Sequence, residues 1–126
     1  MKDTIYSYSG RVASGKKLGR KLGFPTANLL LEEQIPISFG VYIASLYVKH
    51  NDIAYPSVVN IGVHPSFPDG PATIEAYILD KDINLYDDEI TIYFHKKIRN
   101  EIKFVDKKDL IAQIQKDVIV AKKFFT

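Results

Sequence analysis

The sequence contains no cysteine among its 126 residues. This absence excludes disulfide bonds, thiolate catalysis and zinc sites built on cysteine. It is compatible with a reducing compartment, and we expect a cytoplasmic protein. Long apolar stretches are also missing, because the longest central run, residues 41–48, falls far short of the ~20 residues that a membrane-spanning helix needs. The first six residues lack the apolar stretch of a secretory signal, so we expect no membrane partner.

What is present fits one globular domain. The chain is 46% hydrophobic and 25% charged, a balance that argues against disorder. A folded chain of this size buries roughly two thirds of the surface that its unfolded form exposes, which is enough for one core. Residues 1–126 are therefore predicted to form a single domain.

The formal net charge of +2 conceals a strong polarity along the chain. Residues 1–23 carry six basic side chains against one acid, and residues 95–126 carry nine against four. The middle, residues 24–94, carries ten acids against two lysines. Such a pattern can serve an anionic ligand and a cation together. The sequence pI of about 8.7 also permits a nucleic acid partner.

Six strand-like segments precede one helical segment. The strands are expected at residues 5–13, 27–31, 40–49, 53–61, 73–79 and 89–98, where β-branched and aromatic residues concentrate or alternate with polar ones. Pro56 predicts an edge or a bulge in its strand. Leu110, Ile114, Val118 and Ala121 recur at helical spacing.

These segments predict a mainly β protein, in which hairpins close into a small antiparallel barrel or sandwich and the helix covers one opening or flank. Asp106 is a candidate N-cap of the helix, and Asp109 lies in the first turn, where the helix dipole favours an acid.

The segment Gly10–Lys17 nearly fits the Walker A pattern of phosphate-binding loops. Lys17 replaces the hydroxyl residue that would contact the metal, and no helix follows to supply its dipole. We therefore do not expect a P-loop nucleoside triphosphatase.

The segment Gly15–Asn28 is more informative. Its glycines recur every four residues and alternate with four cations and no acid, so backbone N–H groups and positive charge can approach an anion. Thr26 and Asn28 follow two residues apart and share one face of a strand, where both oxygens could bind a hard cation such as Mg²⁺. A basic surface loop followed by a strand explains the same residues equally well on physical grounds alone.

Glu75 is the only acid inside the strand-like run Thr73–Ile78. An exposed strand face tolerates a solvated glutamate, so the residue alone leaves two readings open. In the other reading, Glu75 is a carboxylate that accepts a proton from a reacting hydroxyl group.

The segment Gly15–Asn28, with its Gly-Phe-Pro-Thr-Ala-Asn core, resembles the signature of the riboflavin kinase family. The likeness continues in the family's order over nearly the whole chain. It includes Phe39–Tyr42, Asn60–Gly62, Ile74–Ala76, Leu79–Asp80, Leu85–Tyr86, Arg99–Phe104 and Asp117.

The resemblance implies a six-stranded antiparallel Greek-key barrel with a C-terminal α-helix. It also implies transfer of the ATP γ-phosphoryl group to the riboflavin 5′-hydroxyl, giving FMN, with Mg²⁺ as cofactor. The implied partners are ATP and riboflavin. In bacteria the module usually forms the C-terminal half of a longer chain, so an FMN adenylyltransferase domain on its N-terminal side is a further implied partner.

The resemblance assigns roles to individual positions. Glu75 is implied as the general base, and Thr26 and Asn28 as the residues that hold Mg²⁺. The implied nucleotide-binding residues are Gly15, Lys16, Gly19, Arg20, Gly23, Phe24, Thr26 and Asn28. The implied flavin-binding residues are Arg99, Glu101, Phe104 and Asp106.

One departure from the family's pattern lies after Leu85-Tyr86, where Asp87 stands at a position usually held by glycine. The turn there either takes another conformation or places Asp87 in the left-handed region that aspartate tolerates.

Two other function classes stay open. A small basic barrel with eight tyrosines could bind RNA or single-stranded nucleic acid. The basic residues cluster around glycines instead of across an aromatic sheet face, so we expect no nucleic acid partner. A flavin-binding domain with weakened catalysis is the other class, and the departure at Asp87 keeps it open.

Overall fold

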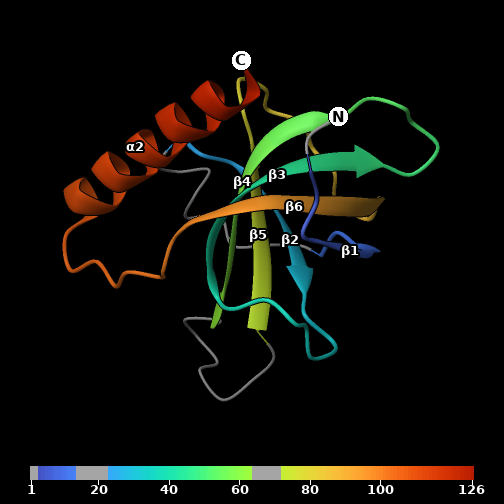
Figure 1. Ribbon diagram of the computed structural model, residues 1–126, viewed down its shortest axis with the longest axis horizontal. Helices are drawn as coiled ribbons and strands as arrows, with labels where there is room; N and C mark the ends of the chain where they lie inside the picture. Colours follow the sequence, from blue (N-terminus) through green and yellow to red (C-terminus); the bar gives the residue numbers. More distant parts are fainter. Residues whose placement is uncertain (1–2, 14–22, 64–71) are drawn as a thin grey trace.

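The computed structural model describes residues 3–13, 23–63 and 72–126. It contains six strands followed by a helix, as the sequence predicts (Figure 1). The elements are β1 (Tyr6–Arg11), β2 (Thr26–Leu30), β3 (Gly40–Val48), β4 (Tyr55–Val63), β5 (Ala72–Ile78), β6 (Glu89–Arg99) and α2 (Lys107–Phe125).

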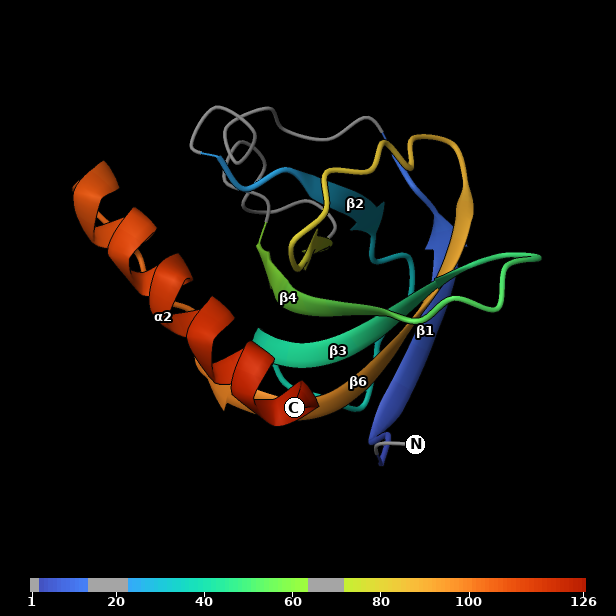
Figure 2. The same cartoon turned by 90° about the horizontal axis from the view of Figure 1, so that it is seen from above.

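The strands form one sheet in the order β1-β6-β3-β4-β5-β2, and every neighbouring pair is antiparallel. The sheet curls until its two edges approach each other (Figure 2). Just beyond β1, the amide of Ala13 donates to the carbonyl oxygen of Asn28 on β2 at 2.8 Å, which makes an isolated antiparallel bridge. The predicted mainly β, barrel-like fold with a C-terminal helix is confirmed.

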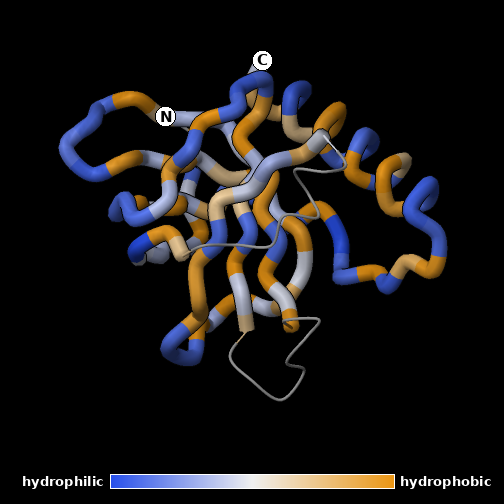
Figure 3. The backbone as a smooth tube through the Cα atoms, turned by 180° about the vertical axis from the view of Figure 1, so that it is seen from behind, coloured by the Kyte–Doolittle hydropathy of each residue, from blue (hydrophilic) through white to orange (hydrophobic). Residues whose placement is uncertain are grey.

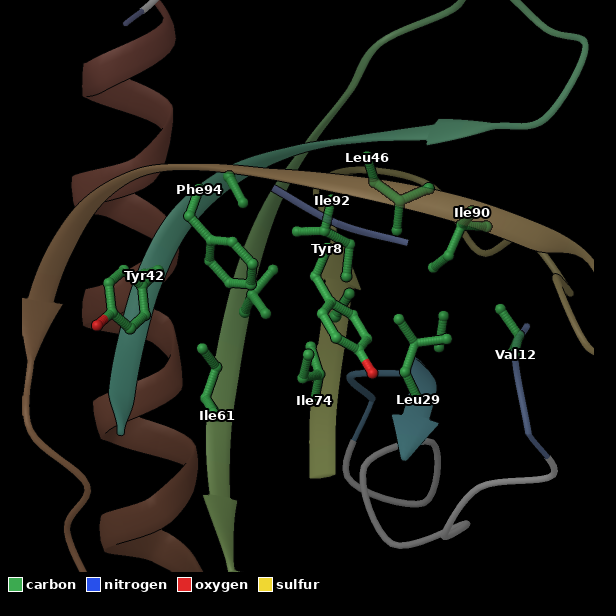
Figure 4. Packing of buried hydrophobic residues seen from close by; sticks show 14 of the residues in the cluster. Tyr8, Val12, Leu29, Tyr42, Leu46, Ile61, Ile74, Ile90, Ile92 and Phe94 are labelled. Atoms are coloured by element: carbon green, nitrogen blue, oxygen red, sulfur yellow. The ribbon is translucent and has the colours of Figure 1, made fainter. Parts of the chain in front are cut away.

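The concave side of the sheet, here called the inner face, holds the main core. Alternation along β6 sets it up, because Ile90, Ile92 and Phe94 are 1% exposed or less and point inward. Tyr42 and Phe94 pack edge to face at 5.4 Å between ring centroids. Figure 4 shows these side chains meeting those of the edge strands, including Tyr8 and Leu29, inside the curl.

The convex side, here called the outer face, is covered in part by α2 (Figure 2). Val41, Ile43 and Val58 on the sheet form a second buried cluster with Ala121 of the helix. Figure 3 shows apolar and polar residues alternating along the helix, as expected for an element with one face packed and one exposed. No helix in the described part of the chain is both long and apolar enough to span a membrane.

The start of α2 is fixed by a side chain that the sequence identifies. Asp106 is the N-cap, and its carboxylate accepts a hydrogen bond from the amide of Lys108 at 2.8 Å. Asp109 lies in the first turn, while Lys122 and Lys123 lie in the last, so both ends complement the helix dipole. These predictions are confirmed.

The expectation that Pro56 marks an edge or a bulge is wrong. β4 lies between β3 and β5, and the register irregularities among the described strands fall between β3 and β6. Pro56 is the second residue of β4 and lies opposite Ser45. Its carbonyl oxygen still accepts a hydrogen bond from the amide of Leu79 at 2.9 Å. A proline at the start of a central strand therefore removes few of the hydrogen bonds between strands.

Asp87 has a φ of 69°, which places it in the left-handed region. Of the two readings of this turn, the structure therefore supports an aspartate in the conformation that a glycine would adopt there. Aspartate tolerates this region better than most side chains do.

His95 connects both ends of the chain to the sheet. Its Nδ1 donates to the carbonyl oxygen of Asp3 at 2.7 Å, and its Nε2 lies 2.7 Å from the hydroxyl of Ser45. Its ring stacks on Phe124 and meets Phe125 edge to face, with centroids 5.9 and 6.0 Å away. The N-terminal segment and the end of α2 are thus held by one buried side chain.

Candidate functional site

Three polar side chains lie side by side across β2, β5 and β4. Asn28 pairs directly with Glu75, and Glu75 pairs directly with Asn60. Residues directly opposite each other in an antiparallel sheet point to the same face, with Cβ atoms about 5 Å apart. Asn60 shares that face with Val58 two residues earlier, so this polar row (Asn28, Glu75 and Asn60) lies on the outer face, the side that α2 covers in part.

Thr26 and Asn28 come together as the sequence predicts. Thr26 is the first residue of β2, and its hydroxyl donates to Oδ1 of Asn28 at 3.2 Å. Asn28 is only 8% exposed, so its amide is fixed within the sheet and not free in solvent. The prediction that both side chains lie on one face is confirmed.

The geometry of this oxygen pair fits a magnesium ion. Two neighbouring ligands of an octahedral Mg²⁺ lie about 3.0 Å apart when each is about 2.1 Å from the ion. The oxygens of Thr26 and Asn28 are 3.2 Å apart, and a carboxylate, Glu75, lies opposite Asn28. Hydroxyl, amide and carboxylate oxygens are the donors that a hard cation prefers. The described residues contain no group of three or more histidine, cysteine, aspartate or glutamate side chains that could hold a metal ion.

Gly23 and Phe24, just before Thr26, lie at one end of this site. Gly23 has a φ of 89°, a conformation that an L side chain rarely adopts. Phe24 packs edge to face on Tyr77 with centroids 5.4 Å apart, and Tyr77 pairs directly with Thr26. Phe24 therefore anchors the chain on the outer face just before the oxygen pair. The predicted nucleotide-binding residues Gly15, Lys16, Gly19 and Arg20 lie outside the described residues.

Arg99 continues the line of the polar row across the sheet, because it pairs with Val41 on β3, and Val41 pairs with Asn60 on β4. Its guanidinium group is engaged with the helix. Nε and Nη2 donate to the carboxylate of Asp117 at 2.8–3.1 Å, and Nη1 donates to the carbonyl oxygen of Asn100. The two side chains are 18% and 6% exposed, so this is a buried ion pair that joins β6 to α2.

Glu101 is brought beside the polar row. Its carboxylate lies against the backbone of Gly62, in the position that a Cβ would take. Gly62 shares the outer face with Asn60, two residues earlier on β4. A side chain at residue 62 would therefore displace the Glu101 carboxylate, and this close approach explains the glycine.

The other two predicted flavin-binding residues, Phe104 and Asp106, have different surroundings. Phe104 is half-buried. The Asp106 carboxylate serves as the N-cap of α2, which was the alternative reading of that residue. The structure thus brings Glu101 to the polar row, while the functional groups of Arg99 and Asp106 are used to join and start structural elements.

Asn60 is a site residue to which the sequence pattern gave no role. Its signal was present, since residues 58–63 read Val-Val-Asn-Ile-Gly-Val, an apolar run with one amide in it. In a central strand covered on both faces, a polar side chain needs a partner, and this is the feature that would have identified Asn60.

Comparisons with known proteins identify the family of this chain. The family model described as Flavokinase, riboflavin kinase, matches residues 3–125. Curated relatives named bifunctional riboflavin kinase/FMN adenylyltransferase include those of Buchnera aphidicola from Schizaphis graminum, at 40% identity, and Escherichia coli K12, at 38%. Each match covers 95% of this chain but 39% and 38% of the relative, so the chain spans about two fifths of their length.

Solved structures show the same fold. A crystal structure titled macrolide-efflux protein from Streptococcus pneumoniae has a TM-score of 0.80 and 29% identity, and the match covers 92% of this chain and 38% of that one. Riboflavin kinase from Trypanosoma brucei has a TM-score of 0.64 at 23% identity, covering 94% of this chain and 78% of that one, which supports the fold alone. Since the family model spans nearly every residue, the chain belongs to the riboflavin kinase family.

Proposed function

We propose that residues 1–126 form a riboflavin kinase module that transfers the γ-phosphoryl group of ATP to the 5′-hydroxyl of riboflavin, giving FMN and ADP. The observation that carries this proposal is the adjacency of the Thr26–Asn28 oxygen pair and Glu75 on one face of the sheet, in a chain of the riboflavin kinase family. This adjacency puts a carboxylate next to the residues that fit a phosphate-bound cation.

In the proposed reaction, the riboflavin 5′-oxygen attacks the γ-phosphorus. A new P–O bond forms as the bond to the oxygen bridging the β- and γ-phosphorus atoms breaks, and ADP leaves with that electron pair. Glu75 accepts the proton of the 5′-hydroxyl. Positioning and charge stabilisation supply most of the rate enhancement in phosphoryl transfer, so the fixed register of Glu75 matters as much as its basicity.

Thr26 and Asn28 are proposed to hold Mg²⁺ together with phosphate oxygens. When bound, the ion neutralises charge on the phosphates. The hydroxyl of Thr26 and the amide of Asn28 are proposed to position the terminal phosphate of the nucleotide. The glycine-rich segment that precedes them, with Lys16 and Arg20, is proposed to cover the phosphates. Glu101 and Phe104 are proposed to contact the flavin.

The test is direct. The protein is incubated with riboflavin, ATP and Mg²⁺, and FMN is separated from riboflavin by chromatography. Formation of FMN that depends on both ATP and the metal supports the proposal. Tight flavin binding without FMN would instead identify a flavin-binding domain with lost catalysis, and salt-sensitive RNA binding without FMN would identify a nucleic acid module.

The names of the curated relatives include a second activity, FMN adenylyltransferase. We propose that this module acts beside such a domain in a longer chain and supplies its substrate, FMN. Conversion of added riboflavin to FAD by the longer chain, with loss of both products in a Glu75 variant, would support the coupling.

A further inference from the structure

Asn60 carries a buried polar atom that no described residue satisfies. Its side-chain Oδ1 is buried and has no hydrogen-bond partner among the described residues. Buried side-chain oxygens in native proteins nearly always have a partner, and an unpaired one is destabilising. The position is central, because β4 lies between β3 and β5 and both faces of the sheet are covered there in part.

The surroundings of Asn60 explain why the oxygen is unpaired. On β3, its direct partner is Val41. Along β4, the neighbours on the same face are Val58 and Gly62, and on β5 the direct partner is Glu75. Valine and glycine side chains offer no donor, and a carboxylate offers only acceptors. None of these direct neighbours can therefore donate to Oδ1, and the hydroxyl-bearing Thr73 and Tyr77, which lie diagonally on β5, do not bond it either.

We propose that Asn60 is a substrate-binding residue whose Oδ1 accepts a hydrogen bond from a hydroxyl group on the polyol chain of the acceptor. This inference rests on the proposed function and deepens it by naming the residue that orients the acceptor. Because Asn60 lies directly opposite Glu75, a hydroxyl bound at Asn60 places the next part of the polyol chain at the carboxylate.

The chemistry of the polar row matches a polyol. Each hydroxyl group donates one hydrogen bond and accepts others, so it complements a side-chain oxygen and an amide N–H in turn. The row presents an amide, a carboxylate and a second amide at cross-strand spacing, about 5 Å from one to the next. The ribityl chain of riboflavin carries several hydroxyl groups in sequence, whereas the flavin ring system offers a single N–H donor, N3–H, at its pyrimidine end.

The competing explanation is that Asn60 serves the fold. The two explanations predict opposite effects of an apolar replacement of similar shape. If Oδ1 is a binding group held ready for a ligand, Asn60→Leu removes an unsatisfied buried atom and leaves the melting temperature equal or higher, while substrate binding suffers. If Asn60 is structural, the same change lowers the melting temperature and affects every ligand alike.

The experiment compares two flavins with two proteins. Intrinsic flavin fluorescence reports binding of riboflavin and of lumiflavin, which has a methyl group in place of the polyol chain, in the presence of ADP and Mg²⁺. We expect Asn60→Leu to weaken riboflavin binding about tenfold, the value of one lost hydrogen bond to a buried group, and to leave lumiflavin binding unchanged. Asn51→Leu is the matched control, because Asn51 lies in the turn before β4, at the other end of that strand.

Equal weakening of both flavins, or no change in riboflavin binding, would overturn the inference. If Asn60→Leu does not fold, Asn60→Ser removes the amide without adding apolar volume, and the same selective loss of riboflavin binding is required. Failure of the proposed function is seen separately, as absence of FMN formation by the unaltered protein. That result leaves the fluorescence comparison able to confirm or overturn the role of Asn60 in polyol binding.

Discussion

Asn28 and Glu75 lie directly opposite each other on β2 and β5, although 47 positions separate them in the sequence. The pairing places the carboxylate beside the oxygen that Thr26 contacts. A single sheet register thus unites the proposed metal-binding and proton-accepting groups. The predictions below ask whether this shared register works as an active site.

Replacing Glu75 with glutamine should leave the fold and nucleotide binding intact and should lower kcat by about 10²–10⁴-fold, the usual contribution of a general base. The amide keeps the size of the side chain but cannot accept the hydroxyl proton. The measurement is steady-state FMN formation, with ADP binding followed in parallel. Glu32→Gln, in the exposed segment after β2, is the control. Near-normal turnover of the Glu75 variant would remove the assignment.

Replacing Thr26 with valine should raise the KM for magnesium ATP about tenfold or more, because a hydrogen-bonding group next to the phosphates and the ion is lost. Valine suits a strand, so the melting temperature should change little. Thr26→Ser keeps the hydroxyl and should retain most of the affinity. Thr91→Val removes a hydroxyl that bonds Ser9 at 2.8 Å, outside the polar row, and should leave the KM unaltered. A normal KM for Thr26→Val would contradict the metal and phosphate role.

Two ion pairs with the same shortest distance should differ greatly in their contribution to stability. Arg99–Asp117 and Lys122–Asp80 are both 2.8 Å, but the first is buried and the second is largely exposed. Arg99→Met should lower the free energy of unfolding by about 3 kcal/mol, since it leaves a buried carboxylate without its charge partner. Lys122→Met should cost less than about 1 kcal/mol. Denaturant titrations would measure both, and equal losses would show that burial is not the deciding factor.

Glu89 provides a prediction for pH dependence. Its carboxylate accepts a hydrogen bond from Lys49 at 3.0 Å, and this bond, the charge of Lys49 and the charge of Arg11 hold the pKa of Glu89 below its ordinary value. A depressed pKa in the folded state means that Glu89 stabilises the fold above its unfolded-state pKa. This contribution is lost as the pH falls through the folded-state value.

The stability difference between the unaltered protein and Glu89→Gln should therefore stay constant from neutral pH down to the unfolded-state pKa, about 4.3, and shrink only as the pH falls below that value through the lower folded-state pKa. Because the pair is exposed, added salt should also reduce the difference. Urea titrations at several pH values and salt concentrations would measure it. A difference that grows on acidification would contradict the sign of the effect.

Much of the fold could be predicted from local sequence. Alternation at Ile90, Ile92 and Phe94 reflects a strand with one buried face, and the cap at Asp106 reflects a helix start, since both depend on near neighbours in the chain. The position of β4 inside the sheet depends on pairings with distant segments, so Pro56 gave a misleading edge signal.

The same limit applies to the site. The two-residue spacing of Thr26 and Asn28 is local, and their contact was predictable. The approach of Glu75 and Asn60 to that pair requires the register of three strands, which no local pattern encodes. Arg99 could not be separated from a ligand-binding arginine, because its partner Asp117 lies 18 residues away on a helix whose rotation is set by packing.

His95 has a consequence for any longer polypeptide that contains this chain. The imidazole donates a hydrogen bond to the carbonyl oxygen of Asp3 and also packs against the rings of Phe124 and Phe125. The two ends of the chain therefore depend on the same side chain for their position. A load applied to one end, such as a tethered domain or an affinity tag, is transmitted through that ring to the other. Trimming the last aromatic residues should therefore loosen the opposite terminus and change the direction in which a preceding segment leaves the barrel.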